Sequence, residues 1–238
     1  MSEALEWFAD LDWVAIGEII VIDILLGGDN ALLIALACRN LPEKQRRLGI
    51  LWGSAGAIVL RVILITVAVA LLDVPLLKLI GGLLLLWIGV KLVASPAESD
   101  GHGDIQASDK LWLAIKTIIV ADFVMSLDNV IAIAGAAEQA DPSQRTGLII
   151  FGLLVSVPFI VFGSQLILKL LDRFPVIVLL GGALLGWIAG GLIIGDTLLE
   201  GRVPHDTMTR YLVSGITAFA VVVIAKIMQA RRKGRSSR

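Results

Sequence analysis

The sequence has few of the side chains that build disulfides, soft metal sites or tyrosine-dependent active sites. It contains one cysteine, Cys38, one tyrosine, Tyr211, and two histidines, His102 and His205, both in polar segments. A single cysteine excludes an internal disulfide and a cysteine-rich metal site. Because no tyrosine precedes Tyr211, the apolar runs before it lack the tyrosine–aspartate pair that is typical of intramembrane aspartyl hydrolases.

Charged residues are also scarce, and their scarcity indicates the class of protein. Only 17% of the 238 residues are charged, 57% are hydrophobic and the mean hydropathy is +0.89. Soluble domains are about 25% charged and about 45–50% apolar. The composition therefore predicts a polytopic protein of the lipid bilayer, with no nucleic-acid partner. The acidic start, "MSEALEWFADLDW", lacks the basic segment of a cleaved signal peptide, so we expect the first apolar run to be retained.

Seven apolar runs reach the length of about 20 residues that a membrane-spanning helix needs. They are residues 12–37, 48–72, 75–94, 111–137, 146–171, 175–195 and 211–230. We therefore predict an all-α fold with seven transmembrane helices. The polar stretch 95–110 is predicted to be a cytoplasmic linker between the third and fourth helices.

Lysine and arginine are distributed unequally between the two sides of this arrangement. Fifteen of the 20 basic residues fall in the loops and tail on one side, four fall on the other, and Arg61 lies inside a helix. Basic residues accumulate on the cytoplasmic side of membrane proteins. The bias predicts a multi-pass protein of the cell membrane with its N-terminus outside and its C-terminus in the cytoplasm.

The two halves of the chain repeat one motif. The segment "VIDILLGGDNALLIAL" (21–36) aligns with "VADFVMSLDNVIAIAG" (120–135), shifted by 99 residues. The aligned polar pairs are Asp23 with Asp122, Asp29 with Asp128, and Asn30 with Asn129. Further along, "VPLLKLIGGLLLLWIG" (74–89) aligns with "FPVIVLLGGALLGWIA" (174–189), shifted by 100 residues.

This repetition predicts two units of three helices each, residues 1–94 and 111–195. Because three is odd, the second unit crosses the membrane in the opposite direction, which makes an inverted repeat related by a two-fold axis in the membrane plane. Residues 196–238 add the seventh helix and a basic cytoplasmic tail.

The repeated polar residues lie near the middle of two apolar runs. A carboxylate there costs at least about 2.5 kcal/mol, and at about 1.5 Å per residue all four aspartates fall within about 7 Å of the midpoints of 12–37 and 111–137. Four such acids repel one another unless protons or a cation neutralise them. Oxygen ligands select hard cations such as Mn²⁺, Mg²⁺ or Ca²⁺. The predicted ligands are Asp23, Asp29, Asn30, Asp122, Asp128 and Asn129. Hydrogen-bonded contact between helices is the structural alternative, and it accounts poorly for four acids without matching basic residues.

Several neighbouring residues are predicted to support this site. Gly27 and Gly28 permit a local break in the first helix, and Ser126 occupies the equivalent region of the second motif. Glu18 either lines an external path or extends toward the membrane interface. Arg61 either pairs with an aspartate when the metal is absent or orients backbone carbonyls at a helix crossing.

The runs "GGDNALLIALACRNLP", "IGGLLLLWIG" and "SLDNV" resemble the TerC family of integral membrane proteins, and the resemblance covers about residues 12–230. The chain looks most similar to the short, YjbE-like branch. The resemblance implies a divalent metal transporter, most often associated with manganese efflux, within the wider grouping of LysE-type exporters. It also implies that the acidic motif residues of the family correspond to the six ligands predicted above.

We therefore expect a transporter, not an enzyme, that exports Mn²⁺ as its substrate by alternating access and carries no prosthetic group. Proton exchange is the predicted coupling. The alternatives are a Ca²⁺ or Mg²⁺ transporter on the same oxygens, an amino-acid exporter, for which only Arg61 is available as a cationic partner, and an intramembrane aspartyl hydrolase. Homo-oligomer formation and a partnership with the secretion machinery stay open.

Overall fold

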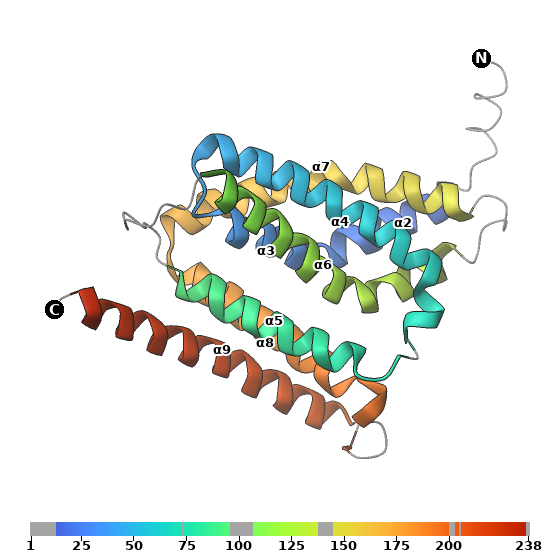
Figure 1. Ribbon diagram of the computed structural model, residues 1–238. Helices are drawn as coiled ribbons and strands as arrows, with labels where there is room; N and C mark the ends of the chain where they lie inside the picture. The colour runs from blue at the N-terminus through green and yellow to red at the C-terminus, as the bar shows by residue number, and fades with distance from the viewer. Residues whose placement is uncertain are drawn as a thin grey trace.

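All the regular elements of the described residues are helices, joined by turns and short irregular segments, and no strand occurs in that part of the chain (Figure 1). It is a computed structural model that describes residues 13–72, 74–95, 107–137, 145–199, 203–204 and 206–236. The helices are α2 (Trp13–Leu26), α3 (Gly28–Cys38), α4 (Glu43–Leu72), α5 (Leu77–Ala94), α6 (Ala107–Ala137), α7 (Arg145–Arg173), α8 (Val176–Ile194) and α9 (Thr207–Ser236), with the short 3-10 helix η1 (Thr197–Leu199). The all-α prediction is therefore confirmed for the described residues.

Five of these helices are long and apolar enough to cross a membrane, or six spans exist if the bent pair α2 and α3 counts as one. The five are α4, α5, α7, α8 and α9. Helix α6 is not among them, although it has 31 residues, and five charged side chains are distributed along it. Five of the seven predicted spans, or six with the bent pair, thus have the length and composition of a membrane-spanning helix. The predicted span 111–137, which lies in α6, stays a prediction.

The first predicted span is two helices, which meet at 48° around Gly27. A Cβ atom at Gly27 would lie 2.5 Å from the backbone oxygen of Asp23, so only glycine fits at the bend. The predicted break at Gly27 and Gly28 is thereby confirmed. The equivalent position of α6 is Ser126, and this helix continues through it without a break.

The helices form two groups. Helices α5, α8 and α9 pack side by side, and α2, α3, α4, α6 and α7 form the second group (Figure 1). Glycines permit the close approach inside the first group. A Cβ at Gly82 would lie 2.8 Å from the backbone oxygen of Ala189 on α8, and one at Gly186 would lie 2.7 Å from the Cα of Ala218 on α9.

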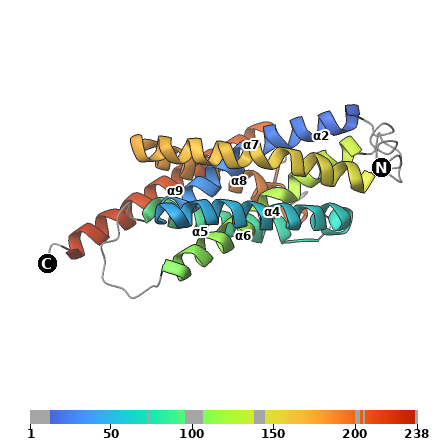
Figure 2. The same ribbon diagram turned by 90° about the horizontal axis from the view of Figure 1, so that it is seen from above.

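The two predicted three-helix units are interleaved. Helix α4 packs along α6, α7 packs along α2 and α3, and α5 packs on α8. Figure 2 shows α7 running beside α2 and α4 beside α6. Each of these pairs joins one helix from residues 1–94 to one from residues 111–195, so neither unit forms a bundle by itself.

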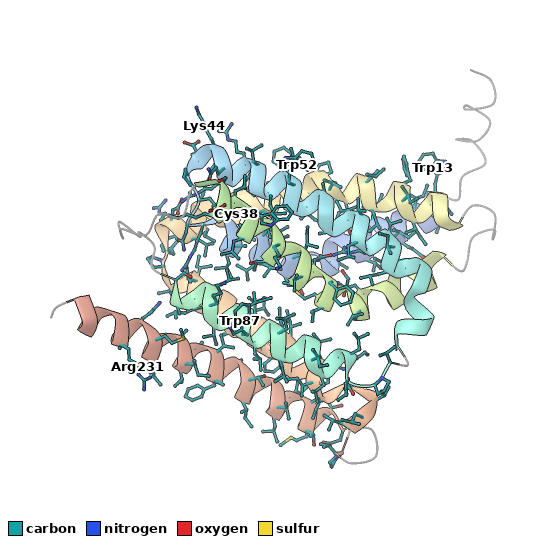
Figure 3. The ribbon with its side chains drawn as sticks, viewed as in Figure 1. Trp13, Cys38, Lys44, Trp52, Trp87 and Arg231 are labelled. Atoms are coloured by element: carbon teal, nitrogen blue, oxygen red, sulfur yellow. The ribbon has the colours of Figure 1, made fainter. Side chains whose placement is uncertain are left out.

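Large apolar side chains cover much of the outer surface. Leu25, Phe162 and Phe219 are each more than 70% exposed. A chain that exposes so many apolar side chains around its helices meets lipid there instead of water. In Figure 3, Lys44 and Arg231 lie toward one end of the helices and Trp13 toward the other, as expected for the two sides of a membrane.

Candidate functional site

An arginine joins the equivalent aspartates of the two motifs. Asp23 on α2, Arg61 on α4 and Asp122 on α6 are all at most 3% exposed. Arg61 Nη1 donates a hydrogen bond to Asp23 Oδ1, and Arg61 Nη2 donates to Asp122 Oδ1 at 2.7 Å. The guanidinium therefore lies between two carboxylates that are 99 residues apart in sequence and equivalent in the repeat.

Two serines occupy the remaining oxygens of this cluster. Ser156 Oγ on α7 donates to Asp23 Oδ2, and Ser126 Oγ donates to Asp122 Oδ2 at 3.1 Å. Arg61 Nε in turn donates to Ser126 Oγ at 3.1 Å. All four carboxylate oxygens thus have a hydrogen-bond partner.

This cluster distinguishes the two roles that the sequence allowed for Arg61. Its contacts are ion pairs with Asp23 and Asp122, so the structure shows the pairing with aspartates, and a role in neutralising them when a metal is absent stays a prediction. Buried ions are costly unless paired and fully hydrogen-bonded, and here the arginine and the two serines supply that pairing. Ser156 was not predicted, because one serine in an apolar helix gives no signal of its partner.

The other motif residues of the first repeat are less well paired. Asn30 is 2% exposed, and among the described residues neither its side-chain oxygen nor its nitrogen has a hydrogen-bond partner. Asp29 is half-buried and accepts a hydrogen bond from the backbone N–H of Asn30 at 2.8 Å. Asn30 thus has a hydrogen-bond donor and an acceptor that no described group uses. Leaving a buried amide without a partner lowers stability by about 1–3 kcal/mol.

A pocket of about 230 Å³ brings the two motifs together at Asp29 and Asn129. It is also lined by Met125, Trp187, Ile188, Gly191, Leu192, Arg210, Tyr211 and Ser214. The rings of Trp187 and Tyr211 lie 5.8 Å apart at its wall. Sequence reasoning placed α9 outside the repeat and assigned it no site residue, yet three of these residues belong to it.

The six predicted ligands are therefore divided between two places. Asp23 and Asp122 are held by Arg61, whereas Asp29 and Asn129 line the pocket and Asn30 lies beside Asp29. The side chain of Asp128 falls outside the described residues, although its backbone lies in α6. Glu18 is half-buried on α2.

No cluster of three or more histidine, cysteine or acidic side chains suited to a metal ion occurs in the part of the chain that the structure describes. The described oxygen ligands at or near the pocket are the carboxylate of Asp29, the amides of Asn30 and Asn129 and the hydroxyls of Tyr211 and Ser214, with the cation Arg210 beside them. The buried acids Asp23 and Asp122, which the described residues bring together, face Arg61. The six-ligand cage stays a prediction.

Comparison with known proteins identifies the family. The sequence model described as "Integral membrane protein TerC family" matches residues 8–233. The chain belongs to the TerC family. It is therefore a multi-pass integral membrane protein, in agreement with its helices and its lipid-facing surface.

The relatives of this TerC-family chain are also membrane proteins. It is 40% identical over 210 residues to the uncharacterized membrane protein YjbE of Bacillus subtilis, covering 88% of this chain and 92% of YjbE. It is 25% identical to the uncharacterized membrane protein YceF of the same organism, over 94% of this chain and 86% of YceF. The inner membrane protein YgdQ of Escherichia coli is 27% identical, over 81% of this chain and 83% of YgdQ. No solved structure matches the chain, and the LysE-type grouping stays a prediction.

Proposed function

We propose that this TerC-family protein is a transporter that exports divalent metal cations, foremost Mn²⁺, across the cell membrane. The observation that carries the proposal is the pocket in which Asp29 from the first motif meets Asn129 from the second. Asn30, next to Asp29 in sequence, has a buried amide without a hydrogen-bond partner among the described residues. A carboxylate and amide oxygens of this kind suit a hard cation. In the proposed site Asp128 supplies the second carboxylate.

Arg61 supplies the positive charge for the remaining aspartates in this proposal. While it pairs with Asp23 and Asp122, the guanidinium offsets part of their negative charge, and the hydroxyls of Ser126 and Ser156 donate to the remaining oxygens. A cation that used all six predicted ligands would have to displace the guanidinium. Arg61 therefore stabilises the unloaded transporter, and the pocket residues bind the cation first.

The packing of the helices supports alternating access as the mechanism. Three packed sets of helices join the two predicted units: α4 with α6, α7 with α2 and α3, and α5 with α8. A two-fold axis between inverted repeats would produce this pattern. The pocket lies where α8 and α9 meet α3 and α6, on the boundary between the two helix groups. Movement of one group against the other would open and close it.

Other functions fit the structure less well. A Ca²⁺ or Mg²⁺ transporter would use the same oxygens, so only a transport measurement separates these ions. An amino-acid exporter needs a cationic group for the substrate carboxylate. Arg61 is occupied by two aspartates, so the exposed Arg210 at the wall of the pocket would have to serve. An aspartyl hydrolase needs two carboxyl groups that act as acid and base and share a proton. Here Asp23 and Asp122 are instead both paired with Arg61.

Metal content of cells tests this proposal directly. Cells without the gene should accumulate Mn²⁺, and the wild-type gene should restore the normal content, measured together with Ca, Mg, Zn and Fe. Asp29→Asn and Asp128→Asn should fail to restore it. Asp109→Asn is the matched control, because this acid lies on α6 at an exposed position in the first turn.

Two results would contradict parts of the proposal separately. If deletion changes no metal content, the export function is wrong. If the two pocket variants restore Mn²⁺ content as well as Asp109→Asn does, the site is wrong. Proton exchange is tested in vesicles, where Mn²⁺ efflux should slow when the proton gradient is collapsed.

A further inference from the structure

A second pocket lies at the opposite end of the helices, where α3 and α5 end and α6 begins. Its volume is about 220 Å³. Its walls are mostly aliphatic and include Leu36, Ile88, Leu92 and Leu113, with Trp87 and Asn40. Two lysines, Lys91 and Lys110, complete the lining. None of the predicted site residues takes part in it.

The two lysines have no described acidic partner. Lys91 Nζ lies 4.9 Å from the centre of the Trp87 ring, and neither Lys91 nor Lys110 forms an ion pair with any carboxylate that the structure describes. A basic residue in the last turn of a helix commonly serves the free carbonyls there. At the end of α5 these carbonyls are bound instead by Arg39, which follows α3. Its Nη2 donates to the backbone oxygens of Leu92 and Ser95 at 2.9 and 2.6 Å. The charge of Lys91 is thus available for another partner.

The pocket opens on the surface that meets lipid. Two of its wall residues, Trp87 and Leu113, are 58% and 50% exposed, and Trp112 beside them is 67% exposed. This is the end of the molecule that carries the greater share of basic residues and is therefore predicted to be cytoplasmic. Basic pockets between helices at that depth bind anionic lipid head groups.

We propose that this pocket binds the phosphodiester head group of an anionic phospholipid. Lys91 and Lys110 contact the phosphate, and the acyl chains follow the exposed faces of Trp87 and Leu113. The aliphatic walls favour a lipid over free phosphate, which would gain nothing from them. Because α5 belongs to one helix group and α3 and α6 to the other, the bound lipid connects the two groups at this end.

Lipid binding to the purified full-length protein tests the proposal. The wild type in mild detergent is titrated with phosphatidylglycerol and with phosphatidylcholine, and bound lipid is counted by native mass spectrometry. The wild type should prefer phosphatidylglycerol. Lys91→Gln and Lys110→Gln should each lower its affinity by about five-fold, the scale of one basic residue at an anionic surface. The control is the double variant Lys44→Gln, Lys169→Gln, which removes two exposed lysines from the same end without touching the pocket.

Each outcome of this experiment decides the proposal. Loss of the preference in the Lys91 and Lys110 variants, with the control unchanged, supports it. Equal binding of both lipids by the wild type, or an equal loss in the control variant, overturns it. In a third arm, inorganic phosphate and glycerol phosphate compete with the lipid; if either displaces it at an equal concentration, the pocket binds a soluble anion and the lipid assignment is wrong.

Discussion

Arg61 is the residue whose environment explains why acids can lie inside this helical bundle. Its guanidinium is 3% exposed and contacts Asp23, Asp122 and Ser126. The second repeat has Ile160 at the position equivalent to Arg61, so one arginine serves carboxylates from both motifs. The arrangement is asymmetric in sequence although the two aspartates are equivalent.

Removal of this arginine should destabilise the protein strongly. Arg61→Gln leaves two buried carboxylates without their cation, and breaking a buried pair in this way costs about 3–5 kcal/mol. In the Arg61→Gln background, Asp23→Asn should cost much less than it does in the wild type, because the pair is already broken. Thermal unfolding of the purified variants measures both effects.

Arg47→Gln is the matched control for this cycle, since it lies on the same helix. Its pair with Glu43 is largely exposed on both sides, and such pairs contribute about 0–1 kcal/mol. Additive effects of Arg61→Gln and Asp23→Asn would show that the two side chains do not interact, contrary to the structure.

At the scale of the helices, the packing of α9 on α8 positions one wall of the pocket at Asp29. Gly190 faces α9 so closely that a Cβ atom would lie 2.6 Å from the Cα of Ser214. The neighbouring Gly191 has more room, with its nearest atom, Arg210 Nε, at 3.7 Å. These two glycines differ in position by one residue and in available space by more than an ångström.

Gly190→Ala should therefore separate α9 from α8, whereas Gly191→Ala should be tolerated. Overpacking of this kind costs about 1–3 kcal/mol. We expect Gly190→Ala to lower the unfolding temperature and the Mn²⁺ transport rate, with Gly191→Ala close to the wild type in stability. Similar losses of stability for both variants would contradict the close approach at Gly190.

The carboxylate of Asp196, which lies two residues after the end of α8, binds backbone N–H groups at the start of α5. Asp196 is 1% exposed and accepts hydrogen bonds from the backbone N–H groups of Leu76, Leu79 and Leu198 at 2.9–3.1 Å. Leu76 has φ 69°, a conformation that side chains rarely adopt. Burial by itself would raise the pKa of Asp196, but the hydrogen bonds from these N–H groups outweigh it and hold the pKa below its ordinary value of 3.8.

Asp196→Ala should lower the free energy of unfolding by about 1 kcal/mol at neutral pH, as the loss of a helix cap does. Since the pKa is lower in the folded protein, the ionised carboxylate stabilises the fold above the ordinary pKa and loses this effect as the pH falls through the folded pKa. The difference between wild type and variant should thus be full at about pH 7 and shrink below about pH 3.8. Thermal unfolding at several pH values measures it, and a difference that grows on acidification would contradict the assignment.

Across the whole molecule, the two pockets lie at opposite ends of the helices. The pocket at Asp29 includes the start of α9, and the pocket at Lys91 includes the end of α5 and the start of α6. The predicted orientation puts the first on the outer side and the second on the cytoplasmic side. Cys38 is the one native cysteine and is fully buried. The reaction of an introduced cysteine with a thiol reagent can therefore show on which side of the membrane each pocket lies.

Thiol labelling in intact cells should locate the two ends. In a Cys38→Ser background, Tyr211→Cys should react with a membrane-impermeant reagent added outside, and excess Mn²⁺ should slow the reaction. Asn40→Cys, exposed at the other pocket, should react only after the membrane is opened. The reverse pattern would mean that the predicted orientation is wrong.

Much of this architecture follows from local features of the sequence. The lengths of the apolar runs predicted the helices, and α5, α7 and α8 begin and end within a few residues of the predicted ranges. The Gly27 and Gly28 pair predicted the break between α2 and α3, because a glycine pair permits a bend wherever it occurs. The repeated motif at Asp29 and Asp128 was visible because identical residues recur at one spacing.

The sequence by itself thus determined most of the apolar helices, the repeated motif and the charged residues that lie within apolar segments, since these depend on composition and spacing along the chain. Only the tertiary structure decided which groups those charges meet. Arg61 reaches Asp23 across 38 residues of sequence and Ser156 reaches it across 133, and α9 closes the pocket at Asp29 from outside the repeat. Contacts between segments so far apart depend on how the helices pack, and no local pattern records that packing.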